Sequence, residues 1–228
     1  MSNQIDDAVA AAEAAAANMT DQTPVVQSQG TSLAPVSNEP VDMSLAAFLT
    51  SGGITPDKWL QVKDTAMKID KNEKKTIDEF SGELNFANVK MFTGLRISLP
   101  GNKYEYIKSY DGRTEARSGQ NWNAAIAEAN ARSQKPSSTY RGADILVTLT
   151  EPVVQGDTTI AVGTKVGYTT SITGFAPFQS YLAELIEAGD VTIKPDGKSM
   201  TGIVGTVLTH ETKKNTDYEW GVVNFSRL

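Results

Sequence analysis

The sequence has no cysteine, and His210 is the only histidine among its 228 residues. The lack of cysteine excludes disulfides, thiolate zinc sites and cysteine nucleophiles. One histidine cannot form a histidine-rich metal site, and the sequence around His210 favours the end of a strand without a chemical role. No P-loop, G-x-S-x-G or H-E-x-x-H motif occurs either. These absences predict a protein that is not an enzyme, with no catalytic residue, no metal site and no cofactor.

Long hydrophobic runs are also missing. No apolar segment approaches the roughly 18 residues that cross a membrane. The first residues, MSNQIDDAVAAAEAAAANM, carry acids where a signal peptide has a basic start, and alanine where it has a stronger apolar core. We therefore expect a soluble protein without a membrane partner, located in the cytoplasm, or in the host cytoplasm if the gene is viral.

Basic residues are absent from the first 57 positions, which hold seven acidic ones. Within this segment, residues 1–43 are rich in Ala, Pro, Ser, Thr and Gln and have few large apolar side chains. Such a composition buries too little apolar surface to offset the entropy of ordering the chain. We predict a disordered acidic tail over 1–43, available to bind a protein partner, and a single β-rich domain over 44–228.

Strand patterns dominate the rest of the chain. Apolar residues recur in short runs bounded by turn residues such as Pro100-Gly101 and Asp111-Gly112, the second being typical of a hairpin. Two segments, 121–133 and 176–190, have helical spacing instead, the first with Asn121 as its cap. Hairpin spacing outweighs βαβ spacing, so the sheet should be mainly antiparallel. The prediction is a mainly β (α+β) fold, a small barrel or sandwich with two inserted helices.

Cations and aromatic rings gather in residues 90–141. This segment carries nine basic residues against four acidic ones, a net charge of +5 in a chain whose net charge is −6. Single-stranded nucleic acid needs both kinds of side chain, cations along its backbone and flat rings for its bases. Because side chains alternate along a strand, a strand over KYEYIKSY would place its three tyrosines and Lys108 on one face. The predicted nucleic-acid-binding residues are Lys103, Tyr104, Tyr106, Lys108, Tyr110, Arg113, Arg117 and Arg141.

The same segment also has an ordinary structural interpretation. Tyrosine favours strands for packing reasons alone, and Trp122, on the expected helix, is typical of a core anchor. The basic residues could equally be a solvated set around a loop at 111–119. The sequence leaves both interpretations open, a binding platform and ordinary packing.

Two stretches carry a resemblance to a known family. The segment IDEFSGELNF and the closing run TGIVGTVLTHETKKNTDYEWGVVNFSRL are similar in style to OB-fold single-stranded DNA-binding proteins of phages or mobile elements. This resemblance implies an OB-like five-stranded barrel, nucleic-acid binding across one sheet face, and a homo-oligomer. Such proteins often recruit partners through an acidic C-terminal tail, whereas here the acidic segment is 1–43.

These observations lead to three functional hypotheses. The first is a non-catalytic single-stranded DNA-binding protein that supports DNA replication or recombination, encoded by a bacteriophage or mobile element. The second is a structural virion protein, a capsid decoration or tail component. Its motive is TTIAVGTKVGYTTSITG, a run typical of β assemblies, together with a flexible N-terminal arm that could lace between subunits. The third, ranked last, is a hydrolase or nuclease that uses Asp144 and Glu151. The sequence does not distinguish DNA from RNA as the ligand.

Overall fold

The computed structural model describes residues 53–69, 74–197 and 199–228. The predicted tail over 1–43 and its boundary with the domain lie outside the described residues. Most of the described chain is β-structure, in one eight-stranded sheet and three two-stranded ribbons. The strands are β1 (Lys58–Trp59), β2 (Gln61–Lys63), β3 (Ala66–Lys68), β4 (Glu79–Asn85), β5 (Lys90–Leu99), β6 (Lys103–Ser109), β7 (Thr139–Leu149), β8 (Val153–Gln155), β9 (Thr158–Ile160), β10 (Lys165–Thr169), β11 (Thr192–Ile193), β12 (Met200–Thr201), β13 (Ile203–Lys214) and β14 (Glu219–Arg227).

Helical structure in the described residues consists of one 3-10 turn and two α-helices. These are η1 (Phe86–Asn88), α3 (Trp122–Arg132) and α4 (Phe175–Ala188). Both helices lie where apolar spacing predicts them. Asn121 caps α3, because its Oδ1 accepts hydrogen bonds from the backbone N–H groups of Asn123 and Ala124. The mainly β fold with two helices is therefore confirmed.

The large sheet branches at β7. Its main path runs β1-β10-β7-β4-β13-β14. Along one edge of β7, residues 147–149 pair with β4 and residues 139–144 pair with β5. Strand β5 pairs in turn with β6, so these two strands form a branch off the main path. All its ladders are antiparallel except the short β1–β10 pair. The sheet does not close, since no ladder between described residues joins β14 to β1. The structure thus shows an open sheet and does not show the small barrel expected from the sequence.

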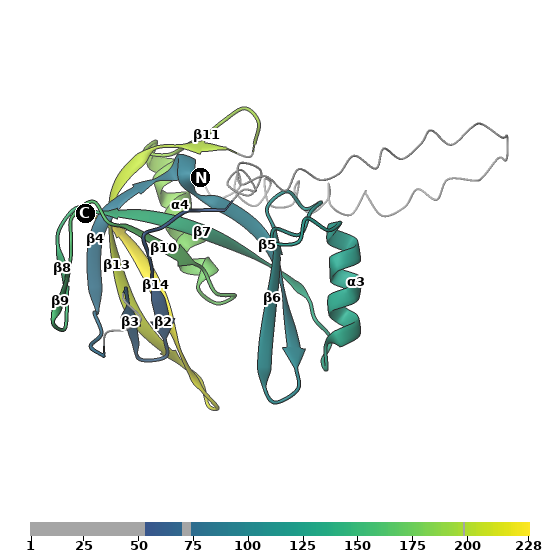
Figure 1. The fold of residues 1–228 in the computed structure, drawn as a ribbon. Helices are drawn as coiled ribbons and strands as arrows, with labels where there is room; N and C mark the ends of the chain where they lie inside the picture. The colour runs from purple at the N-terminus through teal and green to yellow at the C-terminus, as the bar shows by residue number, and fades with distance from the viewer. Residues whose placement is uncertain (1–52, 70–73, 198) are drawn as a thin grey trace, which may run out of the picture. The chain divides into compact units, whose positions relative to one another are not determined.

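The main hydrophobic core lies between the sheet and α4 (Figure 1). Phe178 of α4 is fully buried and stacks on Phe86 at a ring-centroid distance of 6.5 Å. Its ring also meets Phe225 of β14 edge-on at 5.4 Å. The helix ends at Gly189, whose φ of 83° lies in the left-handed region that glycine adopts without steric cost. Apolar periodicity over this segment thus predicts both the helix and the face that it buries.

A second, smaller core lies between α3 and the β5–β6 hairpin (Figure 1). Leu95 and Ile97 of β5 pack there with Trp122, Ala125 and Ala129 of the helix. Trp122 is 5% exposed, so it is a core anchor, as its position on the expected helix suggested. This small core holds one face of β6 against α3. The opposite face of β6 points away from the helix.

The turn expected at Asp111-Gly112 does not close a hairpin. Asp111 Oδ1 accepts hydrogen bonds from the backbone N–H groups of Arg113 and Thr114, both 2.8 Å long, and Gly112 has a φ of 70°. The side-chain hydroxyl of Thr114 and these N–H groups hold the pKa of Asp111 well below its usual range. The chain then continues through an irregular loop into α3, because the carboxylate stabilises a local turn rather than a return strand.

The Thr- and Gly-rich run 158–174 is used within the protein itself. It forms β9 and β10, and β10 pairs with β7 and buries Val166 and Tyr168 in the main core.

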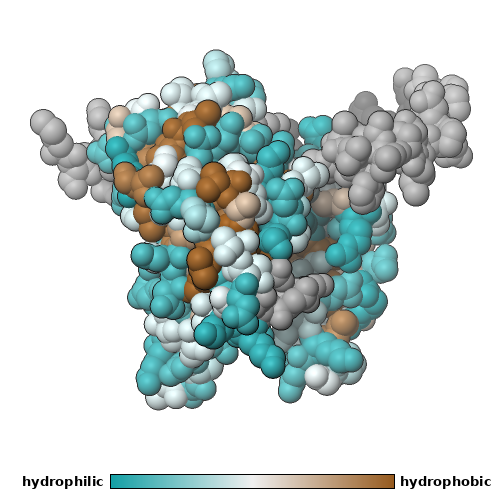
Figure 2. Space-filling model, turned by 60° about the vertical axis from the view of Figure 1, so that its left-hand side comes forward, coloured by the Kyte–Doolittle hydropathy of each residue, from teal (hydrophilic) through white to brown (hydrophobic). Residues whose placement is uncertain are grey.

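On the outside, Figure 2 shows one face where hydrophobic residues form patches within a largely hydrophilic surface. Apolar atoms make up a large part of any folded protein's exposed surface, so this exposure by itself identifies no binding site. None of the helices in the described part of the chain is long and apolar enough to cross a membrane.

Candidate functional site

Strand β6 presents its tyrosines on one face. Tyr104 and Tyr106 are 50% and 52% exposed, and their partners on β5 are Ser98 and Arg96. Lys108 follows on the same face, because side chains alternate along a strand. The opposite face of β6 carries Ile107, which packs against the α3 core. Local alternation therefore separates an aromatic, basic face from an apolar one.

A cavity of about 910 Å³ lies over this aromatic face. Its wall includes backbone and side chains of 53–55, β5, β6, the start of β7, and the 169–173 segment before α4. Three cations line it: Arg96, Lys108 and Arg117. Six aromatic rings line it: Phe92, Tyr106, Tyr110, Tyr140, Tyr218 and Trp220. The cavity therefore combines the two kinds of side chain that single-stranded nucleic acid requires.

Two glycines leave space for two of the aromatic rings that line the cavity. A Cβ at Gly94 would lie 2.5 Å from the ring of Tyr140, and one at Gly142 would lie 2.3 Å from the ring of Phe92. The rings cover these glycines and meet each other edge-on, with a centroid distance of 6.1 Å. Burial is the main reason that the pKa of Tyr140 rises to about 12. At neutral pH this ring is uncharged and presents an apolar body with a hydroxyl donor.

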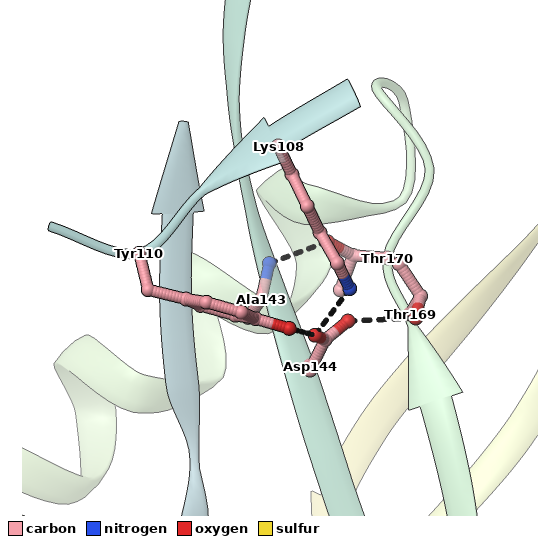
Figure 3. Close-up of polar contacts among 6 residues, drawn as sticks. All are labelled: Lys108, Tyr110, Ala143, Asp144, Thr169 and Thr170. Atoms are coloured by element: carbon pink, nitrogen blue, oxygen red, sulfur yellow. Dashed lines mark hydrogen bonds and ion pairs between the residues drawn. The ribbon is translucent and has the colours of Figure 1, made fainter. Parts of the chain in front are cut away.

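A buried carboxylate holds several of the lining side chains in place (Figure 3). The side chain of Asp144 on β7 is 1% exposed, and its Oδ2 lies 2.5 Å from Lys108 Nζ. Tyr110 Oη donates to the same oxygen, and Thr169 Oγ1 donates to Oδ1 at 2.7 Å. Burial and this carboxylate raise the pKa of Tyr110, so the phenol stays protonated as a donor. Asp144 of β7 thus holds the side chains of Lys108 and Tyr110 in place, although these two residues lie more than 30 positions away in sequence.

The two arginines of the cavity have different surroundings. The guanidinium carbon of Arg96 lies 5.1 Å from the centroid of the Tyr104 ring, a cation–π arrangement that orients both side chains. Arg117 is exposed near Glu115, a buried acid that accepts hydrogen bonds from the backbone N–H groups of Arg117 and Ser118. Burial alone would raise the pKa of Glu115, but hydrogen bonds from Ser118 and Arg117 hold it below its usual range. Glu115 is therefore ionised and shapes the loop that carries Arg117.

Part of the wall comes from the far end of the chain. Tyr218 and Trp220 belong to the turn and first residues of the β13–β14 hairpin, and their ring centroids are 5.5 Å apart. The predicted binding set includes neither of them, and it also omits Phe92, Arg96 and Tyr140. Asp144 is predicted only as a residue of the hydrolase hypothesis, not as a partner of Lys108. The segment DYEW holds a local signal for an aromatic face. Its two aromatic residues are two positions apart, and such residues share one face of a strand.

The structure brings together only part of the predicted binding set. Tyr106, Lys108, Tyr110 and Arg117 line the cavity, and Tyr104 lies beside it on the same face. Lys103 pairs with Leu99 on the face of β6 that packs against α3. Arg141 pairs with Thr93 and lines a separate hollow of about 220 Å³. Arg113 is exposed in the loop before α3 and lines neither hollow.

The carboxylates of the hydrolase hypothesis are not brought together. Both oxygens of Asp144 accept hydrogen bonds from Lys108, Tyr110 and Thr169. Glu151 lies beyond the end of β7 at Leu149, and the five residues from position 144 to that end span about 16 Å at the rise of a strand. Among residues 53–69, 74–197 and 199–228, no group of three or more His, Asp or Glu side chains could hold a metal ion.

Comparison with known proteins gives no relative. No protein-family model, no curated protein and no solved structure matches this chain. The OB-fold resemblance therefore stays a prediction, and any functional assignment depends on the geometry of the cavity.

Proposed function

We propose that this protein binds single-stranded nucleic acid in the 910 Å³ cavity, as a non-catalytic DNA-binding protein that supports replication or recombination. The observation that carries the proposal is the gathering of six rings and three cations around one cavity, from β5, β6, β7, the loop before α3 and the β13–β14 hairpin. Random exposure of aromatic residues would scatter them, whereas a base-stacking site needs them in one place. Stacking of a base on such a ring contributes about 1–3 kcal/mol.

The geometry favours a single strand over a duplex. The rings of Tyr106 and Tyr140 offer their surfaces inside a hollow rather than on a flat or convex surface. Bases within a duplex are stacked on each other and present only their edges, so they cannot enter such a hollow without unpairing. A single strand presents unstacked bases to the rings while its phosphates lie near Arg96 and Arg117 at the cavity wall.

Several finer features belong to this proposal. An OB-like barrel, a homo-oligomer, a protein partner for residues 1–43 and a phage or mobile-element origin all stay predictions. The virion-protein alternative draws on the run 158–174 and on an N-terminal arm. In the described residues this run pairs with β8 and β7 of the same chain, and the arm lies outside the described residues, so neither supports assembly. We therefore propose nucleic-acid binding alone.

A matched pair of arginine variants tests the proposal. Arg117 and Arg141 are both exposed and lie in the same basic segment, but only Arg117 lines the cavity. We expect labelled oligo-dT to bind the wild type, as measured by fluorescence anisotropy, and to bind a duplex of the same length more weakly. Arg117→Ala should weaken binding and reduce the slope of log affinity against log salt by about 0.7. Arg141→Ala should leave both the affinity and the slope unchanged.

Three results would count against the proposal. The first is that oligo-dT does not bind at about 50 mM salt, where electrostatic attraction is strong. The second is that the duplex binds as tightly as the single strand. The third is that Arg117→Ala and Arg141→Ala have equal effects, because binding would then follow the net charge of the segment and not the cavity.

A further inference from the structure

Lys108 differs from the other two cations of the cavity because its charge is already paired. Its Nζ lies 2.5 Å from Asp144 Oδ2, whereas neither Arg96 nor Arg117 lies within ion-pair distance of a described carboxylate. Glu115 is near enough to Arg117 for that charge to help lower the pKa of Glu115, but the two side chains form no direct pair. A phosphate that approached Lys108 would also meet the negative charge of Asp144 directly behind it. The attraction between the phosphate and Lys108 is therefore largely cancelled, and Lys108 is a poor counterion for the backbone.

Lys108 is nevertheless well placed as a hydrogen-bond donor. An ammonium group has three N–H donors, and Asp144 accepts the only hydrogen bond that Lys108 Nζ makes to a described residue. The ring centroids of Phe92 and Tyr110 lie 5.1 Å and 5.2 Å from Nζ and hold the ammonium in position. The side chain is 32% exposed and lines the cavity, so its remaining donors can reach a ligand there.

A fixed donor beside stacking rings matches the edge of one class of base. Thymine and guanine carry an exocyclic carbonyl oxygen, O4 or O6, that accepts from a lysine, whereas adenine carries a donating amino group at the corresponding position and accepts only at its ring nitrogens. We propose that Lys108, neutralised by Asp144, reads the carbonyl oxygen of a thymine or guanine stacked in the cavity. Lys108 is thus a specificity-determining residue and not a phosphate contact. This inference depends on the proposed single-strand binding at the same cavity.

The test compares oligo-dT with oligo-dA of equal length on the wild type and two variants, by fluorescence anisotropy over a salt series. Each variant is compared with the wild type on the same oligonucleotide, so that stacking within oligo-dA cancels. The double variant Lys108→Met, Asp144→Asn removes the donor and leaves no buried charge unpaired. It should lose about 5- to 100-fold in affinity for oligo-dT and less than about 2-fold for oligo-dA, with an unchanged salt slope.

The single variant Asp144→Asn is the second arm. It removes the neutralising carboxylate but keeps Lys108, so the salt slope should become steeper by about 0.7 for both oligonucleotides. Melting temperatures establish that each variant is folded, and the single variant alone still tests the pairing if the double variant fails to fold. If the salt slope of Asp144→Asn equals that of the wild type, the proposed neutralisation of Lys108 by Asp144 is overturned.

The outcomes separate the two proposals. If the wild type binds oligo-dT but the double variant loses equal affinity for oligo-dT and oligo-dA, base reading by Lys108 is overturned and single-strand binding stands. If the wild type binds neither oligonucleotide at low salt, the proposed function is overturned, and base reading is overturned with it.

Discussion

The two faces of the β5–β6 hairpin carry different side chains in opposite environments. On one face, Leu95, Ile97 and Ile107 pack with Trp122 in the small core beneath α3. On the other face, Tyr104 and Tyr106 are half exposed, and Arg96 lies over the Tyr104 ring and lines the cavity together with Tyr106. Aromatic residues thus stabilise the fold on one side and are free to bind on the other. An aromatic or basic residue in this segment has a role that depends on its face, not on its type.

The largest effect should come from the packed face. Trp122→Ala removes a large side chain that is 5% exposed and leaves a cavity in a core of few residues. We expect the free energy of unfolding to fall by about 3–5 kcal/mol, measured by urea denaturation. At a temperature where the variant is folded, its affinity for oligo-dT should match the wild type. A loss of affinity without a loss of stability would place Trp122 in the binding site and contradict the comparison.

The second largest effect should come from Gly142, because the ring of Phe92 packs directly on this glycine. Gly142→Ala places a Cβ where the ring of Phe92 now lies, at 2.3 Å, so the ring or the strand has to move. We expect a destabilisation of about 1–3 kcal/mol, measured by thermal or urea unfolding, because overpacking forces side chains from their preferred positions. The double variant Phe92→Leu, Gly142→Ala should be less destabilised than the sum of the two single variants. Strict additivity would show that the ring and the glycine do not interact.

The two faces also show what the sequence could predict. Strand β6, helix α3 and the Asn121 cap follow from local patterns, and alternation alone assigns Tyr104 and Tyr106 to one face. The same alternation places Lys103 on the other face. The net charge of the segment does not distinguish Lys103 or Arg141 from the cations that line the cavity. Strand alternation does exclude Lys103, because it assigns this residue to the face that packs against α3.

Other parts of the site required the tertiary structure. Trp220 and Tyr106 are more than 100 positions apart in sequence, and they meet at the cavity only because the β13–β14 hairpin folds back toward β6. The pairing of Lys108 with Asp144 likewise needs β6 and β7 to flank β5 in one sheet. No local pattern encodes these contacts, because they depend on which strands become neighbours. The open sheet is a global property of the same kind.

A smaller effect on stability, but a clear effect on binding, is expected on the exposed face. Tyr106→Ala removes a ring that is 52% exposed, so the free energy of unfolding should change by no more than about 0.5 kcal/mol. Loss of one stacking surface should weaken oligo-dT binding by about 1–3 kcal/mol, measured by anisotropy. Tyr106→Phe is the matched control and should retain most of the affinity, because stacking uses the ring face. Equal losses for Ala and Phe would instead assign the binding to the hydroxyl.

The smallest effect should come from Arg132, which belongs to the basic segment but lies on the α3 side of the hairpin. Its guanidinium pairs with Glu105 at 2.9 Å, and the two side chains are 45% and 34% exposed. An exposed pair of this kind contributes about 0.2–1 kcal/mol, so Arg132→Ala should lower stability only slightly.

The effect of Arg132→Ala on binding is the sharper test of the comparison. Deleting Arg132 or Arg96 removes the same charge from the segment, but only Arg96 lines the cavity. Arg132→Ala should leave oligo-dT affinity and its salt slope unchanged, whereas Arg96→Ala should weaken binding and lower the slope by about 0.7. If both variants lowered the slope equally, the segment would act through its total charge, and the two faces of the hairpin would be equivalent for binding. A difference between them would show that strand alternation, and not the charge of the segment, decides which cations meet the nucleic acid.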